Sequence, residues 1–208
     1  MNKRIMIARV LIVACVYPTI SFARYKSQPL SKISVHSSTI NSHKDEFISF
    51  HYKILDAKAC KKYFNTTSIL KKGYQPIQIM FINNSAHNIL ISPNNFSFEC
   101  SNPQDVANCL HRDGMSRGIG FGIASLWFLP LIFPALIQGL GATEYNNAMD
   151  IDFQTKCLKH QIIAPFSSIN QVIFVRHEEF STAFTCKVKN IDQNIVFKLY
   201  PGQSRFIS

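Results

Sequence analysis

The sequence predicts a mainly β fold, an antiparallel β-sandwich interrupted by an inserted helical hairpin that is rich in glycine, proline and apolar residues. About seven or eight short segments alternate apolar and polar residues, and turn-forming residues separate them. The number and spacing of these segments are typical of an immunoglobulin-like sandwich. The interruption is residues 118–143, GIGFGIASLWFLPLIFPALIQGLGAT, a run of 26 residues without a charge.

The alternation is clearest in two segments. In residues 46–55, Ile48, Phe50, Tyr52 and Ile54 fall on one face, and in residues 74–82 Ile77, Ile79 and Phe81 do the same. Both segments are therefore predicted to be strands with one buried face. Further strands are expected at residues 88–92, 96–100, 161–164, 171–175, 182–188 and 194–200.

Three helices are expected outside the uncharged run. Asp56 is placed to cap a short helix that ends near Phe64, and a second short helix is expected at residues 103–110. Residues 143–159 carry apolar residues four positions apart, which predicts a helix that docks on the sandwich. This stripe consists of Tyr145, Met149, Phe153 and Cys157.

The uncharged run is long enough to cross a bilayer as a helix, but Pro130 and Pro134 lie near its middle and glycines crowd its ends. Each half would be about 11 residues, or about 17 Å of helix, which is too short to span alone. Three interpretations remain: a hairpin in one leaflet or against the protein itself, a kinked single span, and a buried pair of helices. We predict the hairpin, because the strands on both sides must meet on one side of any membrane.

The hairpin would expose a large apolar surface, which predicts contact with lipid, with another copy of the chain, or with an envelope protein. Arg112 and Arg117 precede it and are placed to meet anionic headgroups. The predicted membrane-contact residues are Trp127, Phe128, Leu129, Leu131, Ile132 and Phe133.

The N-terminus predicts export. Residues 1–23 combine a basic start, a short apolar region and the cleavage pattern Ser-Phe-Ala ending at Ala23, so we interpret them as a signal peptide. Two alternatives stay open: Cys15 as the lipidated first residue of a lipoprotein, and an uncleaved anchor. Residues 24–45, which are serine-rich, are predicted to be a flexible tether, and residues 46–208 the sandwich domain with its helical insertion at 103–159.

Charge and composition favour a lipid partner over a nucleic acid. The signal segment contains three basic and no acidic residues, so its removal lowers the formal net charge from +10 to +7. A basic exported protein suits anionic lipid. No basic cluster alternates with stacking aromatics and no nucleic-acid-binding motif is present, so we expect no nucleic-acid partner.

The cysteines carry the main candidate chemistry. Cys100 and Cys109 bracket a short polar loop, and in an oxidising compartment we predict a disulfide between them, the alternative being two small buried residues. Zinc binding by short Cys/His pairs around Cys109 and Cys157 has weak support. The sequence contains no HExxH, P-loop or nucleophile-elbow motif. We therefore predict no catalytic, cofactor-binding or metal-binding residue and no cofactor.

Several phrases resemble a family of uncharacterised bacterial exported envelope proteins and lipoproteins. They are CKKYFNTTSILKKGYQPIQIMFINNS, HRDGMSRGIGFG before the proline-broken apolar run, GLGATEYNNAMDIDFQTKCL after it, and IIAPFSSINQVIFV. The resemblance covers most of residues 46–176. It implies a cell-envelope β-domain with a GYQPIQI-type strand and a hydrophobic insert, and it implies no catalytic residues.

Together these observations predict an exported, membrane-associated protein of the cell envelope with a structural, binding or assembly role. Two other classes remain. One is a secreted effector that inserts its hydrophobic hairpin into a foreign membrane. The other is an envelope enzyme that uses cysteine and histidine, which would require a cleft containing a perturbed Cys or His.

Overall fold

The computed structural model describes residues 24–33, 41–44, 48–112 and 132–200, and within them the chain is mainly β, with two antiparallel sheets and few helices. The chain divides into two compact units. Met1–Tyr25 and His111–Ala148 form the first, and Lys26–Leu110 and Met149–Ser208 form the second. Both sheets belong to the second unit.

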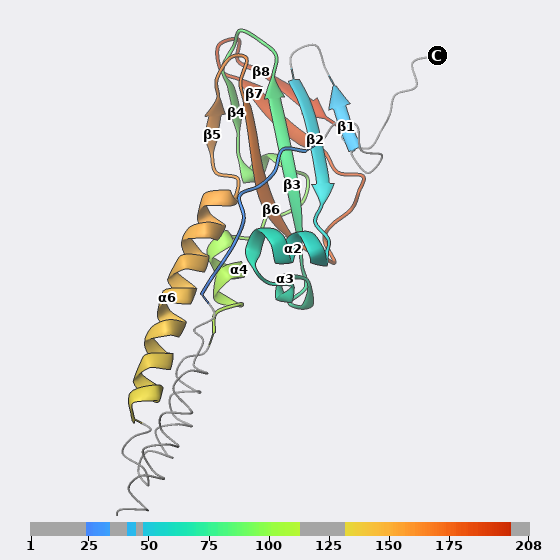
Figure 1. The fold of residues 1–208 in the computed structure, drawn as a ribbon. Helices are drawn as coiled ribbons and strands as arrows, with labels where there is room; N and C mark the ends of the chain where they lie inside the picture. Colours follow the sequence, from blue (N-terminus) through green and yellow to red (C-terminus); the bar gives the residue numbers. More distant parts are fainter. Residues whose placement is uncertain (1–23, 34–40, 45–47, 113–131, 201–208) are drawn as a thin grey trace, which may run out of the picture. The chain divides into compact units, whose positions relative to one another are not determined.

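Each sheet has four strands (Figure 1). The first has the order β1-β2-β3-β6 and comprises β1 (Asn41–Lys44), β2 (Ile48–Ile54), β3 (Tyr74–Asn83) and β6 (Ser168–Arg176). The second has the order β5-β4-β7-β8 and comprises β5 (Gln161–Ile163), β4 (Ile89–Ile91), β7 (Cys186–Asn190) and β8 (Ile195–Leu199).

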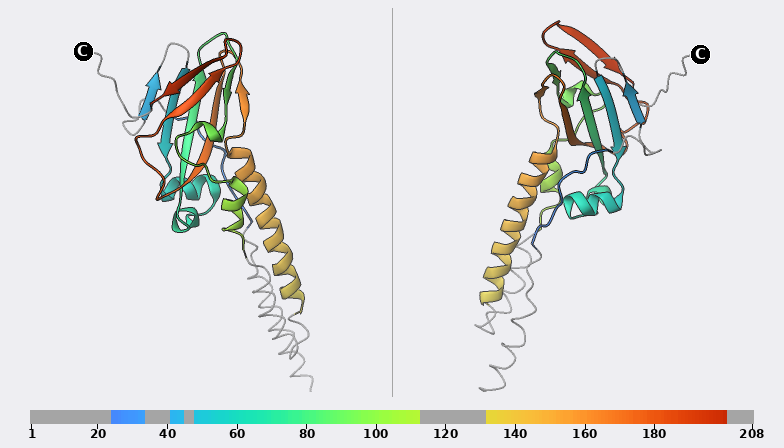
Figure 2. Two further views of the ribbon diagram at one scale, coloured as in Figure 1. Left: turned by 180° about the vertical axis from the view of Figure 1, so that it is seen from behind. Right: turned by 45° about the horizontal axis from the view of Figure 1, so that its top comes forward.

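One hydrophobic core contains buried residues from both sheets, and the view from behind shows β7 and β8 in front of the first sheet (Figure 2). Phe50 of β2 stacks on Phe81 of β3 with 4.4 Å between ring centroids, and Phe184, which precedes β7, meets the ring of Tyr52 at 4.9 Å. The predicted inward faces of β2 and β3 are therefore confirmed, except at Ile54, which ends β2 and is 39% exposed.

A buried amide links the two sheets at one end. Asn83, the last residue of β3, donates from Nδ2 to the carbonyl oxygens of Ile163 in β5 and of Ala164, at 3.2 and 3.0 Å. Its Oδ1 accepts from the N–H and the hydroxyl of Ser85. Because both ends of the amide are satisfied, its burial carries no unpaired polar group.

The helices follow their sequence signals. Asp56 caps α2 (Ala57–Phe64), accepting a 2.7 Å hydrogen bond from the N–H of Ala59, as predicted. Gly73 lies between the short helix α3 (Ser68–Lys71) and β3, and its φ of +79° is a conformation that favours glycine. The remaining helices are the 3₁₀ helix η2 (Pro93–Asn95), α4 (Pro103–Asn108) and α6 (Ile132–Lys156).

Two predictions about these elements were wrong. Residues 96–100 form no strand; only Phe96 makes a bridge, to Cys186. The helix expected at 143–159 begins much earlier, at Ile132, and ends at Lys156. Pro134 falls in its first turn, where a missing N–H breaks no hydrogen bond, and the glycines after it do not end the helix.

The predicted tether is partly structured. Residues 24–33 lie against the outer face of the first sheet, and Asn41–Lys44 form the edge strand β1. The side chain of Gln78 in β3 donates to the carbonyl of Ser31 at 2.6 Å, and Ile33 is buried. Hydrogen bonds to a neighbouring strand hold this segment. The sequence did not reveal them, because the segment was assigned as a tether from its low apolar content.

Candidate functional site

The candidate site is the predicted membrane-contact stretch, described together with the segments that flank it in the sequence. Trp127, Phe128, Leu129 and Leu131 lie outside the described residues, and of the turn predicted at Pro130–Pro134 only residues 132–134 are described, as the start of α6. Ile132 and Phe133 begin α6. Within the described part of the chain, no helix combines the length and apolar character needed to cross a bilayer.

Helix α6 contains two different kinds of sequence. Its first twelve residues, 132–143, continue the uncharged run, and its last turns contain the predicted docking stripe. Met149, Phe153 and Cys157 of that stripe are buried in the second unit, which confirms the docking face. One helix therefore joins the end of the apolar run to the β-domain without an intervening loop.

An aromatic cluster fixes the C-terminal part of α6. The ring of Phe153 lies 4.7 Å from that of Phe64 at the end of α2, and it stacks on Phe174 of β6 at 5.3 Å, with 13° between the planes. Phe64 and Phe174 are 5.5 Å apart, so the three rings contact one another. All three side chains are fully buried, on the side of the first sheet that faces away from the main core.

A buried ammonium group lies beside this cluster. Lys156, the last residue of α6, is 8% exposed; its Nζ donates to the carbonyl oxygen of Tyr63 at 2.5 Å and to the carboxylate of Asp152 at 2.8 Å. Burial lowers the pKa of Lys156, and Asp152 opposes that shift. Asp152 also accepts from the hydroxyl of Ser27 at 2.9 Å, so one carboxylate joins the helix to the N-terminal segment.

The beginning of the insertion is held within the first unit. The side chain of Asn146 bonds both backbone groups of Arg112, accepting from its N–H at 2.9 Å and donating to its carbonyl at 3.0 Å. The guanidinium of Arg112 lies 3.6 Å from the centre of the Tyr145 ring, and Tyr25 meets that ring edge-on at 5.3 Å. Arg117, the other predicted headgroup contact, lies outside the described residues.

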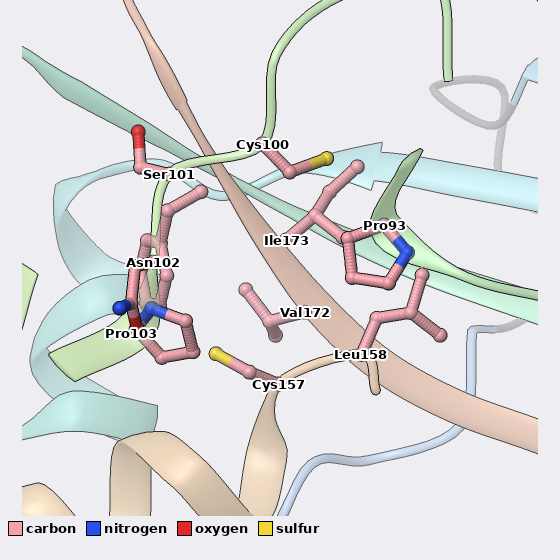
Figure 3. Close-up of a pocket in the computed structure, with 10 residues that line it drawn as sticks. Pro93, Cys100, Ser101, Asn102, Pro103, Cys157, Leu158, Val172 and Ile173 are labelled. Atoms are coloured by element: carbon pink, nitrogen blue, oxygen red, sulfur yellow. The ribbon is translucent and has the colours of Figure 1, made fainter. Parts of the chain in front are cut away.

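A small cavity of about 120 Å³ borders the docked end of α6 and contains two thiols (Figure 3). Cys100 and Cys157 point to opposite sides of it, Cys100 toward Ile173 and Cys157 toward Pro103. Burial raises the pKa of Cys100 to about 12 and the pKa of Cys157 further. Both thiols are thus protonated and weakly nucleophilic at neutral pH.

The predicted disulfide is not formed in the structure. Cys100 and Cys109 are both free thiols, and the Sγ of Cys109 lies 3.9 Å from the hydroxyl of Tyr74, whose ring is covered by Arg176. The pairing stays a prediction for the protein in an oxidising compartment. In the structure Cys100 and Cys157 line the same cavity, and their spacing in the sequence did not indicate that they lie near each other.

The described residues hold no group of three or more His, Cys, Asp or Glu side chains arranged to bind a metal ion. His51, on the outer face of the first sheet, is 5% exposed, its Nδ1 has no hydrogen-bond partner, and burial lowers its pKa.

Sequence reasoning missed the pair Asp152 and Lys156 and the rings that meet Phe153. The four-residue spacing of the pair on a predicted helix is a signal that could have found it. Comparison with family models, with curated proteins and with solved structures gives no match to this chain.

Proposed function

We propose that this chain is an exported protein of the cell envelope that attaches to a membrane and has a structural, binding or assembly role without catalysis. The observation that carries the proposal is helix α6. Its first half continues an uncharged run of 26 residues, and its second half docks on the β-domain through fully buried Phe153. The apolar end of α6 and its docked end thus belong to one continuous helix, which supports an attachment of the β-domain through this segment.

The proposal extends to the architecture. The two antiparallel sheets form a sandwich of the immunoglobulin-like kind, and residues 118–143 form the inserted hairpin. Helix α6 is its second arm, beginning at Ile132 between Pro130 and Pro134. The beginning of α6 is compatible with a turn at the prolines, and the resemblance to exported envelope proteins and lipoproteins favours the same arrangement.

The described thiols give little support to the enzyme alternative. The three buried thiols with the largest upward pKa shifts, Cys100, Cys157 and Cys186, are held in the protonated form, whereas a catalytic thiol needs a lowered pKa or an adjacent base.

Fractionation of producing cells tests the proposal and separates it from the effector alternative. We expect the full chain in the membrane pellet of the envelope, resistant to a high-salt wash because its attachment is apolar. Recovery from the culture medium would favour the secreted effector. Recovery only in the soluble periplasmic fraction would contradict both.

Labelling of single cysteines tests the hairpin. Cysteines introduced at Gly114 and at Asn147, which is exposed and avoids the Asn146 contacts to Arg112, flank the run, with the native thiols replaced by alanine or serine. A membrane-impermeant maleimide should label both positions from the same side of the membrane. Labelling from opposite sides would establish a single span instead.

A further inference from the structure

A cluster of lysines covers the α2–α3 end of the second unit. Within residues 57–73, five exposed lysines and no acidic residue occur: Lys58, Lys61, Lys62, Lys71 and Lys72. Among the described residues, no salt bridge within 4.0 Å involves any of these five lysines. Five acidic residues lie near this end: Asp56, whose side chain caps α2; Asp105, whose charge acts on the hydroxyl of Tyr74; Asp152, which forms an ion pair with Lys156; and Glu178 and Glu179, which follow His177, whose N–H donates to the carbonyl of Gly73. The five lysines, together with Lys156 and with Arg176 over the Tyr74 ring, exceed these five acids, so the surface is positively charged.

This end is also where the chain leaves and re-enters the unit. The chain leaves after Leu110 and returns at Met149, and both points are tied to the α2–α3 end. Near the point where the chain leaves, the Sγ of Cys109 lies 3.9 Å from the hydroxyl of Tyr74, and two residues separate Tyr74 from the end of α3. Beside the return, Phe153 contacts Phe64, the last residue of α2. The uncharged run is part of the segment between these two points.

We propose that the five lysines of α2 and α3 form a surface that binds the anionic headgroups of a phospholipid bilayer and so orients the domain with this end toward the membrane. The inference rests on the proposed membrane attachment and adds the lipid class and the orientation. Lysines clustered where the chain leaves for and returns from a membrane-attached segment would gain electrostatic attraction to anionic lipid, which falls off within a Debye length. Lipid is favoured over nucleic acid because the same end gives rise to an apolar run.

The second sheet provides a matched control. Its outward-facing Lys187, Lys189 and Lys198 lie on β7 and β8, and no residue of its four strands is acidic. Replacing these three by glutamine removes as much charge as replacing Lys58, Lys71 and Lys72, which make no described side-chain hydrogen bond. The two triple variants therefore have equal net charge and differ in where the charge is lost.

The experiment measures binding of the full chain to phosphatidylcholine vesicles with and without phosphatidylglycerol. Each lysine near the surface contributes about fivefold to affinity, so K58Q/K71Q/K72Q should weaken binding to anionic vesicles by up to about 100-fold and leave binding to neutral vesicles unchanged. The control K187Q/K189Q/K198Q should bind both as the unchanged chain does. Raising the salt from about 0.1 M to about 1 M should remove the preference for anionic vesicles.

Several outcomes overturn the inference. Equal binding to neutral and anionic vesicles would leave membrane attachment intact but remove the anionic-lipid surface. An equal or larger loss in the control variant would place the surface on the second sheet or assign the effect to net charge. Binding to duplex DNA of similar charge density, without binding to anionic vesicles, would replace lipid by nucleic acid as the partner. Binding to neither kind of vesicle would contradict the proposed function itself.

Discussion

Replacing Phe153 by alanine should be among the most destabilising single changes in α6. The side chain is fully buried, and its ring contacts Phe64 at 4.7 Å and Phe174 at 5.3 Å. Truncating a buried phenylalanine costs about 3–5 kcal/mol. We expect the upper part of that range, because the two neighbouring rings are themselves fully buried and have little freedom to fill the space. The loss is a large share of the roughly 5–15 kcal/mol of a typical domain.

Ile151, two residues earlier on the same helix, supplies the control. It is 67% exposed, so Ile151→Ala should change the free energy of unfolding by no more than about 0.5 kcal/mol. Thermal and urea unfolding followed by circular dichroism would measure both. For a chain of this size, a loss of about 4 kcal/mol lowers Tm by about 8–16 °C. The docking of α6 is refuted if the two variants unfold together, or if Phe153→Ala costs less than about 1 kcal/mol.

Three further outcomes follow from single side chains. Asp152→Ala leaves the buried ammonium of Lys156 without its carboxylate and should cost about 3 kcal/mol of unfolding free energy, measured by urea unfolding. Adding Lys156→Met to that variant should recover most of the loss, and an equal loss in the single and the double variant would contradict this reasoning. Burial lowers the pKa of His51, so folding stability should fall as the pH drops below about 6.5, where the unfolded state binds the proton. His51→Met should reduce that loss between about pH 7.5 and about pH 5, and an unchanged slope would show that His51 does not contribute. In the reduced protein, iodoacetamide should modify exposed Cys109 first and buried Cys157 only after unfolding, as read by mass spectrometry, and equal labelling of both thiols would contradict the burial. In the protein purified from the oxidising compartment without reductant, the predicted disulfide to Cys100 should protect Cys109, and rapid labelling of Cys109 there would argue against that disulfide.

The strands were predictable where apolar residues recur at every second position. Ile77, Ile79 and Phe81 alternate with polar or less apolar neighbours, and that alternation identified β3 and its inward face. The same pattern does not show that Gln78, on the other face, is also buried. Its burial depends on hydrogen bonds to Ser31, from a segment whose composition resembles a tether.

Helix α6 shows a different limit. Gly139 and Gly141 were interpreted as the end of the uncharged run, with a separate docking helix beginning at residue 143, because glycine is unfavourable in a helix interior. Pro134 costs little in the first turn, and tertiary packing of the docked half overrides a glycine penalty of about 1 kcal/mol each. Local preference therefore placed a break where the helix is continuous.

The candidate site was predictable as a pattern but not as an arrangement. The four-residue period identified Met149, Phe153 and Cys157 as a docking face, yet a period does not say which residues face it. Likewise the lysines of α2 and α3 are visible in the sequence. Their position beside the points where the chain leaves and re-enters the unit depends on contacts such as Phe64 with Phe153, which only the fold brings together.

Flotation of the full chain with lipid vesicles tests the central claim, attachment through the uncharged run, most directly. The comparison is between the unchanged chain and the double variant Leu129→Asp with Ile132→Asp, each aspartate costing several kcal/mol in a lipid interior. The account predicts that the unchanged chain floats with the vesicles, whereas the variant stays unbound and unfolds at the same temperature. A variant that floats as well as the unchanged chain would contradict the attachment, and a variant that fails to fold would identify the run as buried core.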